Sequence, residues 1–403
     1  MKDEKIIQIS PKTSWVGVLD KDIVIFDVVM ETKFGTTYNS YFINAEKKAV
    51  VETVKETFWS VYKEKLSKLT KLEEIEYIIV NHTEPDHSGS VGLLLNEAPN
   101  AVVVGSGNAI RYLKDLLNRD FEHIVVKDGD VLDLGGATMK FIGAPNLHWP
   151  DSIYTWYEEE NLLFTCDSFG SHFCHDEMID NKVGNFDEAF DYYFDVILKP
   201  YSKFLLKAIE KISTLPIKAI LTGHGPLLLN DWKRYVGRSK NRAEEYLKNP
   251  DNTKVLVAYV SAYGKTTAIA KEIARGIESE NKAKAHLLDI ENAPLGEIDA
   301  CITASSGIVV GCPTINQNIL LPAYKLLAAV SPIRDRGKIA GAFGSYGWSG
   351  EAAPILKSAM QNLKLDFCDE GVFVKFTAGE EELKMAYQYG KKLAEKVLER
   401  QNN

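Results

Sequence analysis

The segment Asn81-His82-Thr83-Glu84-Pro85-Asp86-His87-Ser88-Gly89 directly follows the apolar run Tyr77–Val80 and holds four metal-binding side chains within six residues. If the run is a β-strand, side chains two residues apart leave the extended chain on the same side. Three of the four then point together: His82, Glu84 and Asp86. The proline disfavours helical backbone before it and the glycine permits a tight bend, so we expect a loop that wraps around an ion. We interpret the segment as half of a two-metal site.

Three later apolar runs also end in side chains that bind metals. The runs are Lys140–Leu147, Asn161–Cys166 and Lys218–Gly223, and the residues that directly follow them are His148, Asp167 and His224 in that order. For any one histidine or aspartate of the segment 81–89 alone, a polar loop facing water is the simpler interpretation, but four together favour a metal site. If all four runs are strands of one sandwich, their ends lie along one edge, and a binuclear site would be assembled there.

Length and composition favour a globular protein of two domains without a membrane span. The chain has 403 residues, of which 45% are hydrophobic and 26% charged, enough to bury a core in each domain. The net charge of -9 and the pI near 5.5 argue against nucleic acid as a partner, because a phosphate-binding surface needs clustered Lys and Arg. The N-terminus lacks the apolar stretch of a signal peptide, so we expect a cytoplasmic protein.

The cysteines predict neither a rubredoxin-type iron centre nor a zinc ribbon. They form no Cys-x-x-Cys pair, and they are Cys166, Cys174, Cys301, Cys312 and Cys368. We expect reduced, mostly buried thiols.

The first part of the chain has the pattern of two β-layers flanked by helices, an αββα sandwich. Short apolar runs between Ile7 and Leu134 alternate with turn residues and indicate a mostly antiparallel sheet. Helices are expected at 58–69, 88–96, 109–117 and 230–247. The aromatic-rich stretch 167–216 is expected to be core, and it carries His172 and His175 close in sequence to Asp167.

The turn-rich stretch Lys248–Asn252 marks the expected boundary between a first domain, residues 1–250, and a second, residues 251–403. Beyond it, Lys254–Val260 is nearly all apolar, as expected of a parallel strand buried on both faces. It leads into the hydroxyl-rich loop 261–267 and a predicted helix at 268–278. Such a junction favours a phosphate, although an ordinary capped turn fits this loop equally well. The loop is neither Gly-x-Gly-x-x-Gly nor a Walker A sequence, which points away from dinucleotides and ATP.

Two later loops support a ligand site. A predicted strand at 300–303 and the run 307–310 lead into loop 311–318, and a predicted strand at 338–343 leads into loop 344–350. Both loops follow strand ends, where ligands bind in open α/β sheets. Their glycines let the backbone approach a flat ring closely, and Tyr346 and Trp348 are candidates to flank it.

With these motifs in order, the sequence closely resembles the flavodiiron proteins, also called A-type flavoproteins, over essentially its whole length. The resemblance is carried by His82-x-Glu84-x-Asp86-His87, His148, Asp167, His224, the Ser-Ala-Tyr-Gly-Lys-Thr loop at 261–266 and the Gly-Ser-Tyr-Gly-Trp-Ser-Gly loop at 344–350. It implies a metallo-β-lactamase-like αββα sandwich with two non-haem irons, followed by a flavodoxin-like doubly wound parallel sheet with FMN. It also implies reduction of dioxygen to water or of nitric oxide to nitrous oxide.

The resemblance assigns residue roles position by position. One iron would be bound by His82, Glu84 and His148 and the other by Asp86, His87 and His224, with Asp167 as the bridge. Tyr192 resembles the tyrosine of the family's substrate pocket. The FMN would contact Ser261, Ala262, Tyr263, Gly264, Lys265, Thr266, Pro313, Thr314, Ile315, Asn316, Ser345, Tyr346, Gly347, Trp348, Ser349 and Gly350.

The resemblance also implies partners, with one departure from the family pattern. It implies a separate electron donor, rubredoxin or alternatively a reduced deazaflavin, and a head-to-tail homodimer or dimer of dimers in which each flavin serves the partner's metals. Many members carry a pocket histidine in the stretch matching Ile25–Val28, and this chain has none. We therefore make no prediction of oxygen against nitric oxide preference.

The ligand chemistry agrees with the resemblance. Zinc hydrolases of the same fold class typically have a histidine at the position of Glu84. A carboxylate there gives three carboxylates and four imidazoles, a harder and more anionic set that suits iron. The main alternative is a binuclear zinc hydrolase of the glyoxalase II or lactonase kind. A second alternative is a flavodoxin-like electron carrier whose first domain is only structural.

Overall fold

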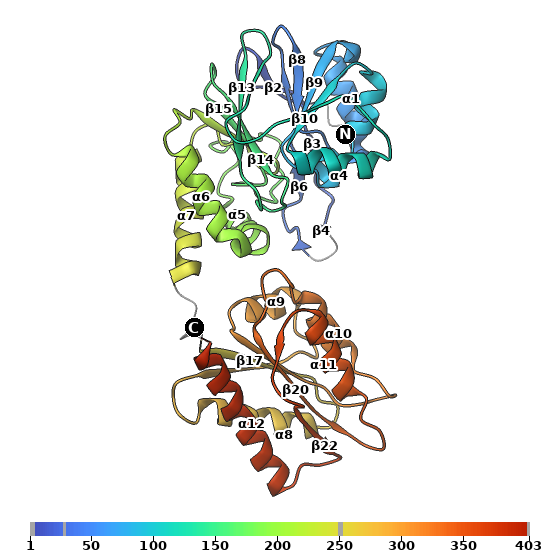
Figure 1. Cartoon of the computed structure of the whole chain (residues 1–403), viewed down its shortest axis with the longest axis vertical. Helices are drawn as coiled ribbons and strands as arrows, with labels where there is room; N and C mark the ends of the chain where they lie inside the picture. Colours follow the sequence, from blue (N-terminus) through green and yellow to red (C-terminus); the bar gives the residue numbers. More distant parts are fainter. Residues whose placement is uncertain (1–4, 27–29, 249–252, 401–403) are drawn as a thin grey trace. The chain divides into compact units, whose positions relative to one another are not determined.

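The computed structural model describes residues 5–26, 30–248 and 253–400. The chain divides into two units, Met1–Leu247 and Lys248–Asn403, which are shown in Figure 1. The stretch 249–252, and Asp27 and Val28 of the segment without a histidine, lie outside the described residues.

The first unit is built on two β-sheets. In the described part of the chain, the larger sheet has seven strands in the order β1-β2-β7-β8-β9-β10-β11 and the smaller has five in the order β12-β13-β14-β15-β16. The larger sheet consists of β1 (Ile7–Gln8), β2 (Thr13–Trp15), β7 (Tyr41–Ile43), β8 (Lys48–Val51), β9 (Ile75–Val80), β10 (Val102–Gly105) and β11 (His123–Val125). The smaller consists of β12 (Val131–Asp133), β13 (Thr138–Gly143), β14 (Ile153–Tyr157), β15 (Leu162–Cys166) and β16 (Ala219–Thr222). Two short pairs are β3 (Val18–Asp20) with β6 (Thr36–Tyr38), and β4 (Ile25–Phe26) with β5 (Met30–Glu31).

Alternation along the strands produces the layers. In β9, Ile79 packs in the apolar cluster between the sheets, whereas Ile78 and Val80 pack in the cluster that includes the outer helices. In β15, Phe164 packs between the sheets and Leu163 against the outer layer. Because successive side chains of a strand leave opposite faces, a strand that is apolar at every position is covered on both sides. This arrangement confirms the predicted αββα sandwich.

Helices cover both outer faces of the sandwich (Figure 1). Beside the larger sheet lie α1 (Trp59–Ser67), α3 (Val91–Glu97) and α4 (Gly107–Leu117), and beside the smaller lie α5 (Asp187–Tyr193), α6 (Ser202–Ile212) and α7 (Trp232–Lys248). Short helical turns occur at η1 (Glu56–Phe58), η2 (Leu72–Glu74), η4 (Lys199–Tyr201) and the π-helical turn η3 (Phe194–Leu198). The helices predicted at 58–69, 109–117 and 230–247 are thus present, with ends shifted by one to two residues.

The prediction of a mostly antiparallel sheet is wrong for half of the larger sheet. Neighbouring strands from β8 to β11 run parallel. The physical reason is connectivity, because parallel neighbours need a crossover connection. Helices α1, α3 and α4 supply these crossovers between successive strands.

The predicted ion-wrapping loop and the helix predicted at 88–96 also differ from the structure. Pro85 begins a helical turn, α2 (Pro85–Ser88), because a proline at the first position of a helix loses no hydrogen bond there. A separate helix, α3, starts at Val91. Asp86 and His87 are therefore carried by a helical turn, and strand alternation does not explain the direction of Asp86.

The second unit is a doubly wound parallel sheet. In the described residues its order is β18-β17-β19-β20-β21, with β22 also pairing with β20, and all these pairs are parallel. Its strands are β17 (Lys254–Tyr259), β18 (Lys284–Asp289), β19 (Gly307–Gly311), β20 (Ile339–Tyr346), β21 (Asp366–Phe367) and β22 (Val372–Lys375). Val255 and Val257 pack on one face with α8 (Lys265–Glu278) and α12 (Glu380–Glu399). Leu256 and Ala258 pack on the other with α9 (Leu295–Thr303), α10 (Leu321–Ala329) and α11 (Ala352–Asn362). The predicted flavodoxin-like fold is confirmed.

Residues 300–303 end helix α9 and do not form the predicted strand. Ile298 and Ile302, four positions apart, are both fully buried, so the apolar spacing there has the helical period. Strand β20 continues to Tyr346, so Gly344 and Ser345 belong to a strand and not to the predicted loop. In the residues that the structure describes, every helix is too short or too polar to cross a membrane.

Candidate functional site

The predicted metal ligands meet where strands of both sheets end. Each follows a strand closely: His82 and Glu84 come after β9, with Asp86 and His87 on the adjoining turn α2, His148 after β13, Asp167 after β15 and His224 after β16. Strand ends from two facing sheets supply side chains from several directions. A compact cluster results, although the ligands are up to 142 positions apart in the chain.

The first group of ligands lies around Glu84. Its Oε2 is 2.9 Å from Nε2 of His148 and 3.3 Å from Nε2 of His82. Both imidazole nitrogens are also 3.5 Å from Oδ2 of Asp167. These four residues each offer one ligand atom within 4.8 Å of the others.

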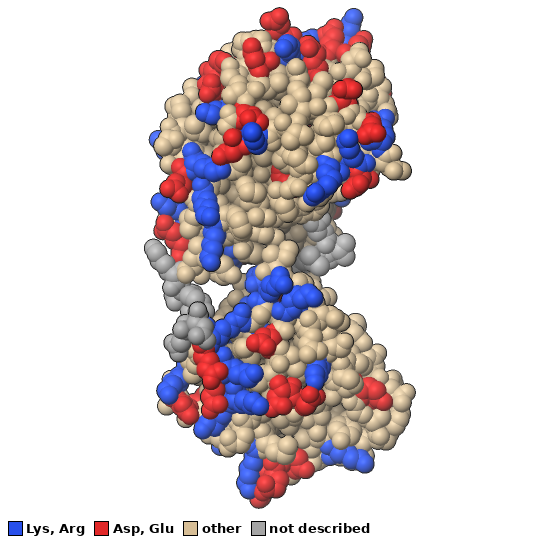
Figure 2. Space-filling view, viewed as in Figure 1, with Lys and Arg blue, Asp and Glu red and all other residues tan. Residues whose placement is uncertain are grey.

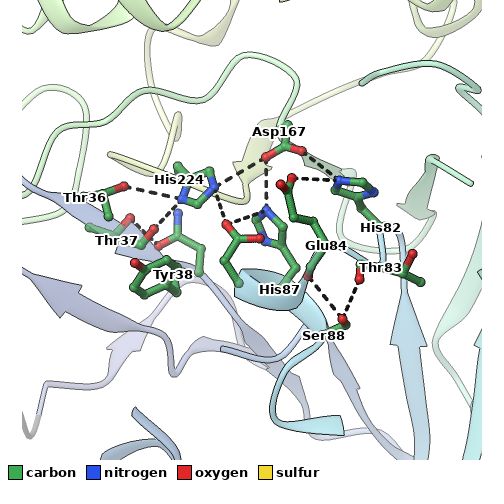
Figure 3. Close-up of polar contacts among 12 residues, drawn as sticks. Thr36, Thr37, Tyr38, His82, Thr83, Glu84, His87, Ser88, Asp167 and His224 are labelled. Carbon is green, nitrogen blue, oxygen red and sulfur yellow. Dashed lines mark hydrogen bonds and ion pairs between the residues drawn. The ribbon is translucent and has the colours of Figure 1, made fainter. Parts of the chain in front are cut away.

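The second group lies around Asp86. Its Oδ2 is 3.1 Å from Nε2 of His224 and 3.4 Å from Nε2 of His87. The other oxygen of Asp167, Oδ1, is 3.1 Å from His87 Nε2 and 3.5 Å from His224 Nε2. Figure 3 shows the Asp167 carboxylate with one oxygen toward His224 and His87 and the other toward His82. Asp167 therefore lies between the two groups.

Burial and unsatisfied oxygens indicate that the cluster fits metal ions. His82 and His87 are fully buried, and Asp167 is 2% exposed. Within the described part of the chain, Asp86 Oδ1 and Asp167 Oδ2 are buried and accept no hydrogen bond. Buried carboxylates without donors are costly unless a cation neutralises them. The side chains of Glu84 and His148 keep 14% and 16% exposure and form the open side of the cluster.

Electrostatic interactions couple the carboxylates to the imidazoles. Burial alone would raise the pKa of Glu84, but the hydrogen bonds from His148 and His82 and the charge of His148 together outweigh it, and the pKa lies well below its usual range. Burial would lower the pKa of His87, but the negative charges of Asp86 and Asp167 raise it to about 10. In the metal-free chain such imidazoles hold protons, and a bound ion would displace them.

The predicted flavin loops meet at the carboxyl end of the parallel sheet. Thr266, 1% exposed at the start of α8, places its Oγ1 3.2 Å from Oγ of Ser345 at the end of β20. The backbone N–H of Thr314 donates to the carbonyl oxygen of Ser345 over 3.0 Å. Ser261 Oγ accepts from the N–H of Thr267. Hydroxyls of separate loops thus surround the N-terminus of α8, as a phosphate requires.

Two aromatic side chains at these loops extend into solvent. Tyr263 is 86% exposed and Trp348 is 78% exposed. Gly264, in the left-handed conformation at φ 73°, begins α8, and a Cβ there would meet open space. Large exposed aromatic side chains beside a cluster of hydroxyls at a helix N-terminus are typical of a site for a flat, phosphorylated ring.

Comparison with known proteins agrees with both halves of the chain. Residues 36–225 match the family described as ODP family beta lactamase, and residues 257–390 match the flavodoxin family. A flavo-diiron protein of Clostridium acetobutylicum is 36% identical over 97% of this chain and 99% of its own. A type A flavoprotein of Rhodobacter capsulatus is 36% identical over 98% of this chain and 92% of its own. The chain belongs to the flavodiiron protein family.

Solved structures of flavodiiron proteins share the fold of this chain. The flavodiiron protein from Giardia intestinalis matches with a TM-score of 0.73 and 30% identity over 98% of this chain and 97% of its own. The rubredoxin oxygen:oxidoreductase of the anaerobe Desulfovibrio gigas matches with a TM-score of 0.76 and 26% identity over 99% and 100%. The resemblance drawn from the sequence is confirmed, and these relatives do not favour the zinc hydrolase alternative.

Two contacts that the sequence did not predict orient ligands of this flavodiiron protein. Nδ1 of His82 lies 3.3 Å from both oxygens of Asp151, which also accepts from N and Oγ1 of Thr83. Nδ1 of His224 donates to the carbonyl oxygen of Thr37 over 2.6 Å. A partner on Nδ1 fixes the tautomer and leaves Nε2 free for an ion. Asp151 is a lone carboxylate and Thr37 contributes only backbone, so neither carried a sequence signal.

Tyr193 supplies the hydroxyl that touches the ligand cluster. Its Oη donates to Asp167 Oδ1 over 3.0 Å, and the residue is 1% exposed. Tyr192, the predicted pocket residue, is partly buried beside it on α5, and its role stays a prediction.

The two histidines that follow Asp167 in sequence differ in position. His172 is 3% exposed, with its ring 5.2 Å from that of His224 and 4.8 Å from that of Tyr193. Phe26, from the stretch without a histidine, packs against it at 4.4 Å. His175 stacks on Phe173 at 6.4 Å and its Nδ1 accepts from a nearby backbone N–H. Only His172 therefore borders the cluster.

Proposed function

We propose that this flavodiiron protein reduces dioxygen, nitric oxide or both at two iron ions that receive electrons from FMN. The position of Asp167 carries the proposal, because its two oxygens face separate groups of two histidines and one carboxylate. His82, Glu84 and His148 would hold one iron, and Asp86, His87 and His224 the other. Seven oxygen and imidazole ligands suit a redox-active metal better than the nitrogen-rich sites of zinc hydrolases.

The residues of the chain hold the metal ligands in position, limit the access of water and leave one side of the cluster open to the gas. When bound, FMN would supply one- and two-electron redox chemistry, and iron ions held by the seven ligand residues would supply the site for reduction of the gas. The open side at Glu84 and His148 gives a small molecule access, while the buried histidines keep bulk water out. Tyr193 holds the Asp167 carboxylate in place, and burial together with the charge of Asp167 raises the pKa of its hydroxyl. That hydroxyl therefore stays protonated and remains a donor at neutral pH.

The proposed FMN phosphate site lies among Ser261, Thr266 and Ser345. Replacing both Ser261 and Thr266 by Ala should weaken FMN by about 3 kcal/mol, since each charge-assisted hydrogen bond contributes ~1.5 kcal/mol or more. Riboflavin, which lacks the phosphate, should bind nearly as before. Ser279→Ala, near the opposite end of α8, is the matched control. Equal losses for both flavins in titration calorimetry would contradict a phosphate role.

A separate rubredoxin is the proposed electron donor, and a reduced deazaflavin is the alternative. The name of the Desulfovibrio gigas relative supports this choice. Figure 2 shows charged side chains of both signs on the visible face of each unit. Because the net charge is -9, the proposal includes neither nucleic acid nor membrane as a partner. Anaerobic reduction by each donor separates the two. We also propose a cytoplasmic location, which cell fractionation tests.

We further propose a head-to-tail homodimer in which each flavin serves the partner chain's irons; a dimer of two such pairs would keep the same contact. The connection between α7 and β17 is short, and each site lies at one end of its own sheet. We therefore expect each flavin to reach the irons of a second chain and not those of its own chain. A two-fold axis would form both flavin-to-iron contacts at once.

Subunit mixing tests the dimer. One chain carries His82→Ala with Asp167→Asn, the other Ser261→Ala with Thr266→Ala, and each is first shown to be inactive alone. Heterodimers should recover up to about half of the activity, since one intact flavin faces one intact metal pair. Verified heterodimers that remain inactive, or a dilute monomer at full rate, would exclude transfer across the interface.

The decisive test of the function is composition followed by turnover. The purified protein should be yellow and contain about two irons and one FMN per chain. After anaerobic reduction it is mixed with dioxygen or nitric oxide in parallel, and flavin reoxidation is followed. A colourless, zinc-containing protein that hydrolyses thioesters would reverse the proposal. Ligand variants that keep full electron transfer to every acceptor would favour the electron-carrier alternative.

A further inference from the structure

The three fully or nearly buried ligand histidines differ in the partner of their second ring nitrogen. A histidine that binds a metal through one nitrogen almost always donates the other N–H to a carboxylate or carbonyl. His82 has Asp151 and His224 has the Thr37 carbonyl for this purpose. In the described part of the chain, Nδ1 of His87 is buried without a hydrogen bond. Among the described residues, the second half-site therefore has no hydrogen-bond acceptor for Nδ1 of His87.

A buried carboxylate oxygen without a donor lies beside it. Glu52 is 1% exposed; its Oε1 accepts from the N–H of Asn81 over 2.7 Å. Among the described residues, its Oε2 has no hydrogen-bond partner. Polar atoms of Glu52, His87 and Cys166 lie within 4.8 Å of one another. An unsatisfied donor and an unsatisfied acceptor thus face the same buried space.

The backbone holds this pair together at a conformational cost. Glu52 has φ 61°, a left-handed conformation that is unfavourable for a residue with a Cβ. Its N–H donates to the carbonyl oxygen of Ile79 on β9. The next residue, Thr53, donates both its N–H and its Oγ1 to the carbonyl oxygen of His87, over 2.8 and 2.6 Å. Residues 52 and 53 therefore contact both the backbone and the ring side of His87.

We propose that Glu52 is the positioning residue of the second half-site, where its Oε2 accepts the Nδ1 proton of His87 directly or through one water. The inference rests on the proposed diiron function. A carboxylate acceptor directs Nε2 toward the ion shared with Asp86 and His224, and it makes the imidazole a more strongly donating ligand. Asp151 does the same for His82 in the first half-site. Each half-site then has one carboxyl side chain behind a histidine.

The test compares Glu52→Gln with Asp151→Asn in the iron-loaded, FMN-containing protein. A glutamine has one acceptor oxygen for two donors, Asn81 N–H and His87 Nδ1–H. Iron remaining per chain is measured after dialysis against graded chelator. Glu52→Gln should weaken one iron by roughly 10- to 100-fold, the range typical for loss of such partners, with flavin content unchanged. Asp151→Asn should weaken the other iron by a similar factor.

A double-mutant cycle shows whether Glu52 acts through His87. In a His87→Ala background, Glu52→Gln should cause no further loss of iron, because the ring it orients is gone. In a His82→Ala background it should cause its full effect. Equal effects in both backgrounds would mean that Glu52 acts on the fold, and would overturn the proposal.

Two further variants keep the proposal falsifiable if Glu52→Gln folds poorly. Glu52→Asp keeps the carboxylate but shortens the reach to the ring, so it should weaken the same iron by a smaller factor. Cys166→Ala should leave both irons in place; selective loss there would assign the acceptor role to the thiol instead.

The mixed-valent state, followed by electron paramagnetic resonance, should form at higher potential in Glu52→Gln because a weaker donor stabilises ferric iron less. An unchanged potential would contradict the proposal. Failure of the diiron function itself appears separately, as absence of iron from the unmodified protein.

Discussion

Each unit contains a buried charge cluster, and the two clusters differ in how their carboxylates are neutralised. In the second unit, Asp335 is fully buried and accepts from Nε and Nη2 of Arg334, over 3.0 and 2.8 Å, and lies 2.8 Å from Nζ of Lys338. Arg334 also pairs with Asp299 over 2.7 Å. Burial alone would raise the pKa of Asp335, but Arg334 and Lys338 lower it. Two carboxylates and two permanent cations form a closed, neutral set.

The carboxylates of the cluster in the first unit have a different kind of partner. The ion-pair partners that the structure describes for Glu84, Asp86 and Asp167 are all imidazoles. An imidazole titrates near neutral pH and loses its proton readily to a competing metal ion. In this protein the buried carboxylate paired with Arg and Lys is therefore structural, whereas the carboxylates paired with histidine are prepared for a cation from solution.

Asp167→Asn disrupts the metal-ligand cluster of the first unit and should have the largest effect, a loss of turnover. A neutral amide oxygen cannot bridge two cations, so turnover should fall by at least ~10³-fold, equivalent to about 4 kcal/mol in the barrier. The flavin spectrum should be unchanged because no residue of the second unit is altered. Iron content and gas turnover are measured together. A variant that binds two irons and turns over normally would show that the bridging assignment is wrong.

Removing the metal should make the stability of the first unit strongly pH-dependent. The pKa of His87 in the folded, metal-free chain, about 10, lies above its unfolded value of about 6.5. Its contribution to stability is therefore fully present below pH 6.5 and is lost as pH rises toward 10, by roughly 3 to 5 kcal/mol. In the iron-loaded protein the ion occupies Nε2, so this dependence should be absent.

Urea unfolding at pH 6.5, 8 and 9.5, with and without chelator, checks that dependence. Tryptophan fluorescence, measured in a Trp348→Phe background so that only the first unit carries tryptophan, and flavin release follow the two units separately. A chelated protein equally stable across this range would show that protonated imidazoles do not neutralise the cluster.

Residue type and order predicted most of the residues that the structure brings together in the candidate metal cluster. A ligand directly after an apolar run marks a strand end, and strand ends of one sandwich meet at an edge, so His148, Asp167 and His224 were found without structural information. The helical turn that carries Asp86 was not predicted, because Pro85 is compatible with both a loop and the first position of a helix. Periodicity alone likewise misassigned residues 300–303, where a short apolar run fits either a strand or the buried face of α9.

Contacts between distant single residues could not be predicted. Glu52 reaches His87 through the pairing of β8 with β9, whereas Asp151 and Thr37 reach His82 and His224 from segments far apart in the sequence. None of the three stands in a motif that marks it. The choice between Tyr192 and Tyr193 depends on the helical phase of α5 against β15. One residue of difference rotates a side chain by about 100°, which composition and spacing do not fix.

Asp335→Asn should lower the stability of the second unit without affecting iron, whereas Asp167→Asn should lower turnover. It leaves Arg334 and Lys338 short of a buried counter-charge, so the free energy of unfolding of the second unit should fall by about 3 to 5 kcal/mol. Iron content should not change. Thermal unfolding followed by flavin fluorescence gives the loss, with the exposed Asp369→Asn as the matched control. A loss of iron, or no loss of stability, would contradict the distinction between the clusters.

Tyr193→Phe should have the smallest effect and should decide which tyrosine serves the metal-ligand cluster of the first unit. The change removes only the hydroxyl that donates to Asp167 Oδ1, and the phenyl ring preserves the packing against His172. Loss of one hydrogen bond to a carboxylate corresponds to about 1.5 kcal/mol, so kcat should fall roughly 10-fold with both irons retained. Tyr192→Phe, one position away on α5, should change kcat by less than about 2-fold. Turnover with saturating reductant is measured for both variants under each gas. If Tyr192→Phe is the slower enzyme, the pocket tyrosine predicted from the sequence is correct and the hydroxyl on Asp167 is only structural.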